Sequence, residues 1–132
     1  MEFKKFKILI FLFAIVINAC QKDKKQLLIG SWVLYDVKTS QIIENPESYQ
    51  LAINELKSTT RINFYPNNIF EGTIWGDTTF GTWQLVNDTI YVADKSFKNK
   101  FKVYIKNISA EKLVLEETED SITSTLIFKK SK

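Results

Sequence analysis

Few side chains in this 132-residue chain have obvious chemical potential. It has one cysteine, Cys20, and no histidine, so it lacks the imidazole of a Ser-His or Cys-His nucleophilic pair and of a zinc site. The densest carboxylates are Glu116, Glu117, Glu119 and Asp120, which could in principle bind calcium or act as acid and base. Because they flank an expected hairpin turn, we expect a solvated charge cluster there, with no catalysis, metal or cofactor.

Cys20 stands directly behind a leader-like segment. Residues 2–7 are basic, and the next ten residues, from Ile8 to Ile17, are all apolar. A helix that spans a bilayer needs about 20 apolar residues. Ten fit the hydrophobic region of a signal peptide instead. We therefore expect residues 1–19 to be removed.

The segment Ile17-Asn18-Ala19-Cys20 resembles the lipobox of bacterial lipoproteins. The resemblance implies cleavage between Ala19 and Cys20 and a diacylglycerol on the Cys20 thiol. An ordinary thiol behind an ordinary secretory leader is the alternative, but a lone cysteine has no disulfide partner in an oxidising compartment. Two or more acyl chains hold a protein on a membrane almost permanently. We thus expect the membrane as a partner through an N-terminal lipid anchor, in the cell envelope at the outer membrane, on the periplasmic side or at the cell surface.

The mature chain divides into a tether and one domain. Residues 20–27 contain Cys20 and a charged run, which we expect to form a polar tether too polar to pack. Residues 28–132 suffice for one core without disulfides. Removing the leader takes away three lysines and one glutamate and leaves 15 basic and 14 acidic residues. This near-neutral balance argues against nucleic acid as a partner, because binding phosphates needs a concentrated basic face.

The domain is predicted to be all-β. Short alternating segments rich in β-branched and aromatic residues are separated by turn residues. The predicted strands are residues 29–38, 59–65, 69–76, 80–86, 89–94, 100–107, 112–118 and 122–129. The short connectors between them are residues 66–68, 76–79, 87–88, 109–111 and 119–121. Connectors of this length join antiparallel neighbours.

One segment breaks the β pattern. Asn45 and Pro46 suit the N-cap and first position of a helix. An apolar stripe follows with helical spacing, at Tyr49, Ala52, Ile53 and Leu56. We expect a helix over residues 46–57, between the first and second strands. An eight-stranded up-and-down antiparallel barrel, which has no free edges, best accommodates this order.

Two sequence features indicate which kind of barrel this is. Gly30-Ser31-Trp32 resembles the Gly-x-Trp motif of lipocalins, in which the tryptophan packs across the closed end of the barrel. Residues 28–34 look like the start of small lipocalin-like lipoproteins of Gram-negative bacteria, and the strings 61–70, 80–85, 112–116 and 126–129 agree in order. The resemblance implies structural roles for Gly30, Trp32, Gly81 and Trp83. Either tryptophan could equally be an ordinary residue of the hydrophobic core. The arginine that larger lipocalins carry near the last strand has no counterpart.

Three functions follow from this reading. The first is binding of a small apolar ligand, since an eight-stranded barrel can hold one or be filled by side chains. Its aromatic lining would come from among Phe64, Phe70, Trp75, Tyr91 and Tyr104, with helix 46–57 as a lid. The second is an envelope scaffold or inhibitor that binds another protein through loops or through exposed Trp75 and Phe80, with a fully packed core. The third, an enzyme, we do not expect.

Overall fold

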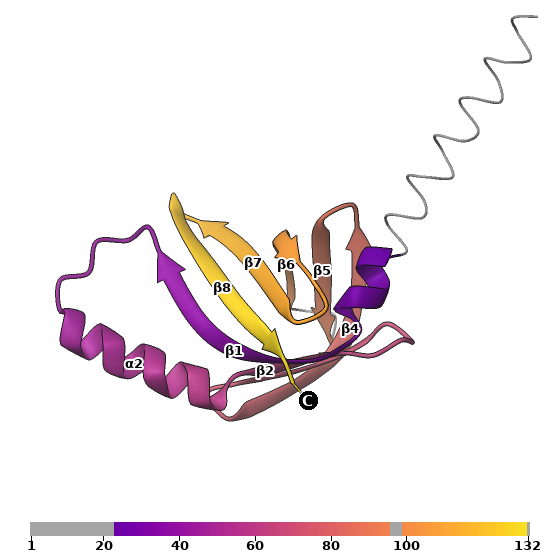
Figure 1. Ribbon diagram of the computed structural model, residues 1–132, viewed down its shortest axis with the longest axis horizontal. Helices are drawn as coiled ribbons and strands as arrows, with labels where there is room; N and C mark the ends of the chain where they lie inside the picture. The colour runs from indigo at the N-terminus through magenta and orange to yellow at the C-terminus, as the bar shows by residue number, and fades with distance from the viewer. Residues whose placement is uncertain (1–22, 96–98, 132) are drawn as a thin grey trace, which may run out of the picture.

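The computed structural model describes residues 23–95 and 99–131 and shows a closed antiparallel barrel of eight strands in chain order, with β1 paired to β8 (Figure 1). The elements are β1 (Gly30–Thr39), α2 (Pro46–Thr59), β2 (Arg61–Phe64), β3 (Ile69–Ile74), β4 (Asp77–Val86), β5 (Thr89–Asp94), β6 (Lys100–Ile108), β7 (Lys112–Glu119) and β8 (Ile122–Lys130). The predicted barrel, with one helix between the first two strands, is confirmed. The predictions for Ala19 and Cys20 fall outside the described residues.

The β3–β4 hairpin differs from the sequence prediction. Its two-residue turn is Trp75-Gly76, and both residues have positive φ, at 55° and 84°. Such a turn follows the natural twist of two antiparallel strands. The ladder therefore continues through Asp77, and the strand that was expected to start at Phe80 begins three residues earlier.

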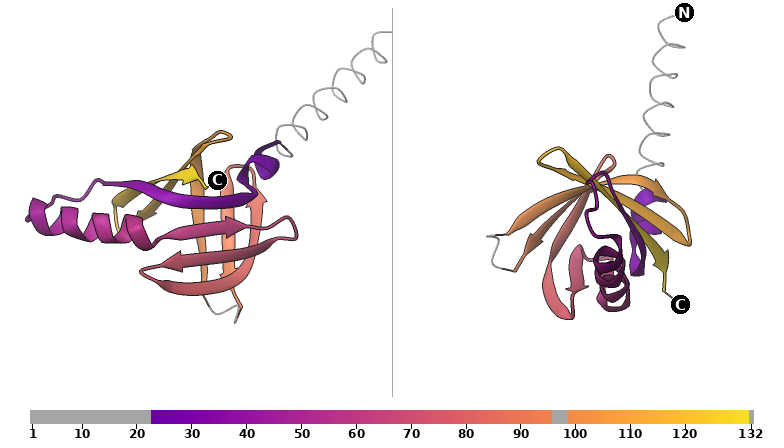
Figure 2. Two further views of the ribbon diagram at one scale, coloured as in Figure 1. Left: turned by 60° about the horizontal axis from the view of Figure 1, so that its bottom comes forward. Right: turned by 90° about the vertical axis from the view of Figure 1, so that its left-hand side faces the viewer.

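Helix α2 begins as predicted and ends two residues later, at Thr59. The Asn45 side chain accepts a hydrogen bond from the Ser48 N–H at 3.1 Å, which satisfies a free donor of the first turn. Ile53 is buried and Leu56 half-buried, but Ala52, expected on the same stripe, is exposed. The buried stripe is thus narrower than expected, and α2 projects from one end of the barrel beside the end of β1 (Figure 2).

The two ends of the barrel differ. One end, here called the open end, holds α2 and the turns at residues 75–76 and 120–121. The other, the closed end, holds the start of β1, the turn at residues 87–88 and a helical segment at residues 23–28. Figures 1 and 2 show α2 and the 23–28 segment on opposite sides of the molecule. No helix in the described ranges is long and apolar enough to cross a membrane.

The helical segment 23–28 overlaps the expected tether of residues 20–27 and contacts the closed end of the barrel. Leu28 is completely buried, and its carbonyl oxygen accepts a hydrogen bond from the Trp32 indole at 2.9 Å. Lys24 forms an ion pair with Asp88, and the Lys25 ammonium lies 5.6 Å from the centre of the Trp83 ring. The lysines pack because aromatic faces and a carboxylate meet them at the closed end, which their charge alone did not reveal.

Candidate functional site

The lipocalin resemblance implies structural roles for four residues, and all of them lie in the barrel wall or core: Gly30, Trp32, Gly81 and Trp83. Trp32 and Trp83 are almost fully buried, and the Trp83 indole donates to the Tyr65 carbonyl oxygen at 3.1 Å. Gly81 lies where β4 and β5 approach closely, since a Cβ there would overlap the Ala93 carbonyl. Both tryptophans therefore have their one polar atom satisfied, and neither offers it to a ligand.

A cation from the last strand covers Trp32. The Lys130 ammonium lies 4.4 Å from the centre of the Trp32 ring and donates to the Ile29 carbonyl oxygen at 2.6 Å. Partial burial lowers the pKa of Lys130 below its ordinary value. Gly30, at φ 134°, leaves room for this ammonium, because a Cβ there would overlap it. Sequence reasoning missed Lys130 because it sought an arginine.

An apolar space of ligand size lies inside the barrel. This inner cavity has a volume of about 180 Å³. Its apolar lining consists of Leu34, Leu56, Ile62, Phe64, Phe70, Ile74, Ile90, Val92, Phe101, Val103, Leu115, Leu126 and Phe128. Thr60 and Glu117 are the polar residues among those that line it. Every strand except β4 contributes to this lining, and Leu56 comes from α2.

The inner cavity adjoins a second space at the open end. This mouth chamber, of about 290 Å³, shares Phe70, Ile74, Val92 and Phe101 with the cavity. Its other lining residues are Gly72, Asp77, Thr79, Asp94 and Asn99. Ile74 and Phe101 are 51% and 48% exposed although they line the barrel interior. The interior is therefore accessible to solvent through an apolar rim.

Thr60 is the polar exception within the cavity wall. The residue is 6% exposed, and its hydroxyl is the one buried side-chain polar atom without a hydrogen-bond partner among the described residues. A buried hydroxyl without a partner costs about 1–3 kcal/mol. Such a group in a ligand-sized cavity marks a position where a polar ligand atom would relieve that cost.

The aromatic residues named from the sequence separate into two groups. Phe64 and Phe70 line the inner cavity, with ring centres 5.6 Å apart. Trp75 lies in the exposed β3–β4 turn, and Tyr91 and Tyr104 alternate with buried neighbours and point outward. Phe101, which lines the inner cavity together with Val103 of the same strand, also lies at the mouth.

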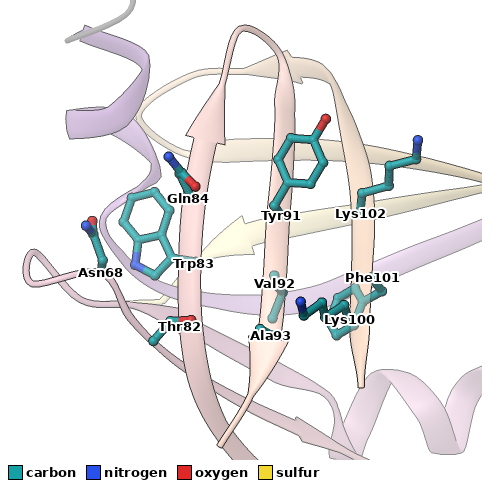
Figure 3. Close-up of a pocket in the computed structure, with 10 residues that line it drawn as sticks. All are labelled: Asn68, Thr82, Trp83, Gln84, Tyr91, Val92, Ala93, Lys100, Phe101 and Lys102. Atoms are coloured by element: carbon teal, nitrogen blue, oxygen red, sulfur yellow. The ribbon is translucent and has the colours of Figure 1, made fainter. Parts of the chain in front are cut away.

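An open hollow lies on the outer face of β4, β5 and β6. Figure 3 shows Tyr91 on the middle strand between Gln84 and Lys102, in agreement with the pairing of Tyr91 with both residues. The hollow has a volume of about 650 Å³ and its outer wall also includes Thr82 and Lys100. It is larger than the inner cavity but lies open on the surface, so it desolvates a bound molecule less.

The carboxylate cluster of the β7–β8 hairpin does not converge on one point. Glu116 faces Lys106 at 3.7 Å, Glu117 lines the inner cavity, and Glu119 ends β7. Asp120 lies in the turn with φ 49°. Within residues 23–95 and 99–131, no group of three or more His, Cys, Asp or Glu is arranged to hold a metal ion.

Comparison with known proteins supports the fold. No protein-family model matches the chain, and no curated protein matches it. Among solved structures, a lipocalin-like protein from Bacteroides uniformis is 17% identical, with a TM-score of 0.51 over 80% of this chain and 99% of that one. An uncharacterized protein from Bacteroides eggerthii is 12% identical, with a TM-score of 0.53 over 79% of this chain and 99% of that one. The chain thus has a lipocalin-like fold.

Proposed function

We propose that this protein is a membrane-tethered lipoprotein that binds one small apolar ligand inside its lipocalin-like barrel. The observation that carries the proposal is the inner cavity of about 180 Å³ with its almost wholly apolar lining. An engineered apolar cavity of about 150 Å³ in another protein is known to bind benzene. The inner cavity is therefore large enough for a ring or a short alkyl chain.

The size of the cavity limits the ligand. Pockets for larger organic ligands usually measure about 300–1,000 Å³. A ligand of that size would have to extend from the inner cavity into the mouth chamber of about 290 Å³. A small molecule with an apolar part in the cavity and the remainder at the mouth fits both spaces.

An anchor at Cys20 would suit this use of the barrel. Asp23, the first described residue, follows Cys20 by three positions and belongs to the helical segment at the closed end. A lipid on Cys20 would hold the closed end near the membrane. The open end, with its accessible interior, would then face away from that membrane.

Binding is tested with toluene and the chain of residues 20–132 carrying Cys20→Ser, which contains every described residue. Val103→Phe fills part of the inner cavity, whereas Val86→Phe places the same ring on an exposed position outside it. We expect calorimetry to show one toluene site in the parent chain and in Val86→Phe, and none in Val103→Phe. Cooperative unfolding of both variants is the control. If the parent chain does not bind toluene, or Val103→Phe binds it equally well, the cavity is not a ligand site.

The anchor is tested separately in a Gram-negative host. We expect the full chain to incorporate labelled palmitate and to partition into the membrane fraction, and its intact mass to show cleavage before Cys20. Cys20→Ser should lose the label and the membrane partitioning. If the variant is processed at the same bond and stays in the membrane without acylation, Cys20 is not an anchor.

A second candidate function is docking of an envelope protein. Trp75 and Phe80 are 51% and 44% exposed, and large aromatic side chains of this kind are enriched at protein interfaces. Trp75 also holds a positive φ of 55°, which is uncommon for a bulky residue. We expect Trp75→Ala to abolish crosslinks to such a partner while toluene binding is unchanged. If the crosslinking pattern stays the same, Trp75 is not part of an interface.

A further inference from the structure

We infer that the ligand is a cationic amphiphile, with an alkyl or aryl part in the inner cavity and an amine head at the mouth. This inference rests on the proposed binding function and adds the charge of the ligand to it. The observation behind it is the sign of the charges that line the two adjoining spaces.

All charged side chains known to line the two spaces are carboxylates. Glu117, on β7, lines the inner cavity itself. Asp77, at the start of β4, lines the mouth chamber, as does Asp94, which accepts a hydrogen bond of 2.6 Å from the Asn99 amide. The proposal depends on Glu117 and Asp77, which approach the interior from opposite parts of the barrel wall.

The lysines near the open end lie elsewhere. The Lys95 ammonium lies 5.7 Å from the centre of the Phe80 ring, on the outside of β4. Lys100 lines the outer hollow and shares a second surface hollow with Glu117 and Phe101, and Lys57 belongs to the last turn of α2. Among the described residues, no lysine or arginine lines the inner cavity or the mouth chamber. A carboxylate head on a ligand would thus meet like charges.

Thr60 provides a separate indication that the ligand has a polar head. Its hydroxyl lacks a partner although the residue lines the inner cavity and is more than nine-tenths buried. Thr60 directly precedes β2 at the open end, and it lines the inner cavity rather than the mouth chamber. An ammonium donates hydrogen bonds, which a hydroxyl oxygen accepts.

The surroundings of the two spaces set the size of the charge effect. Phe70, Ile74 and Phe101 make the wall between the cavity and the mouth apolar. Glu117 and Asp77 are themselves exposed, so water and salt screen their attraction for a bound ammonium and keep it modest. The alkyl part contributes the same binding free energy whatever the head group. Differences in affinity between ligands of one chain length therefore come from the head group.

The experiment compares three ligands with the same alkyl chain: octan-1-ol, octylammonium and octanoate, at pH 7. The protein is the chain of residues 20–132 with Cys20→Ser, and calorimetry measures each Kd. We expect octylammonium to bind about fivefold tighter than octanol, and octanoate to bind more weakly than octanol. Higher ionic strength should narrow these differences.

The matched variants identify the source of the selectivity. The double variant Glu117→Gln with Asp77→Asn should bring the Kd of octylammonium to that of octanol when both are measured in that variant. Glu111→Gln, in the turn before β7 at the closed end, should retain the parent selectivity. The inference is overturned if octanoate binds as well as octylammonium, or if the double variant keeps the selectivity. In either case, binding of octanol would still support the proposed function. Failure to bind octanol overturns both.

Discussion

The Lys130 ammonium lies over the Trp32 ring at 4.4 Å from its centre while donating a hydrogen bond to the Ile29 carbonyl oxygen at 2.6 Å. The last strand thereby secures the start of the first, in addition to the ladder between β1 and β8. Because Trp32 is completely buried and also bonded to Leu28, this contact joins β8 to the segment that leads toward Cys20.

Replacing Lys130 should weaken the closed end. Lys130→Met removes the cation over Trp32 and leaves the Ile29 carbonyl oxygen without this donor, so we expect a loss of about 1–2 kcal/mol in the free energy of unfolding. Lys130→Arg should recover most of it, since guanidinium also stacks on indole. Urea unfolding measures both. Equal stability of Lys130→Met and the parent chain would show that the contact contributes nothing.

The same lysine should give the protein a distinct alkaline pH dependence. Burial lowers the pKa of Lys130 in the folded chain below its ordinary 10.5. Between the lowered pKa and 10.5 the unfolded chain binds more protons than the folded one, so the contribution of Lys130 to stability rises with pH. The stability gap between the parent chain and Lys130→Met should widen as pH rises through this window. A gap that stays constant in urea titrations at several pH values would contradict this.

Gly30 and Gly76 allow a matched comparison. Both have positive φ, at 134° and 84°, but a Cβ at Gly76 meets nothing within 4 Å, whereas one at Gly30 would overlap the Lys130 side chain. Gly76→Ala should cost about 1 kcal/mol from the backbone alone, and Gly30→Ala about 1 kcal/mol or more beyond that. Thermal or urea unfolding reports both values. If the two substitutions cost the same, Lys130 does not constrain Gly30.

The strands could be predicted because the alternation of apolar and polar residues, and the turn residues between strands, are features of short stretches of sequence. Alternation places Phe101, Val103 and Ile105 on one face, and the barrel does turn all three inward. The N-cap and first position of α2 were equally local, since Asn45 and Pro46 carry the signal themselves. The length of the connectors then fixed an antiparallel order in which only closure of the barrel removes the free edges.

Where the pairing between two strands is irregular, the alternation of apolar and polar residues does not identify which side chains face the barrel interior. A register shift between Leu34 and Asp36 lets both Leu34 and Val37 pack on the core, although strict alternation would have turned Asp36 inward. A similar shift between Ile105 and Asn107 brings Ile108 to the core. Bulges of this kind depend on the partner strand, so one sequence does not reveal them.

The candidate site was predictable only in outline. An eight-stranded barrel was expected to hold side chains or one small ligand, but the volume left inside depends on how Phe64 and Phe70 pack against each other. Glu117 lies in a run of carboxylates that reads as a solvated turn, and it is indeed exposed, but the run did not reveal that it also lines the inner cavity. Lys130 was overlooked because its role depends on a contact 98 positions away in the chain, with Trp32.

Thr60 should show opposite effects on stability and binding. Thr60→Val keeps the shape of the side chain and removes a buried hydroxyl without a partner, so we expect the free energy of unfolding to rise by about 1 kcal/mol. If that hydroxyl meets the ligand head, the same change should weaken octylammonium binding by about threefold or more. Thr78→Val is the control, because its hydroxyl lies on the surface and shares a hydrogen bond of 3.0 Å with Thr73. We expect the control to leave binding unchanged and stability equal or slightly lower. Loss of stability in Thr60→Val would mean that the hydroxyl is already satisfied, and its part in ligand recognition would then be refuted.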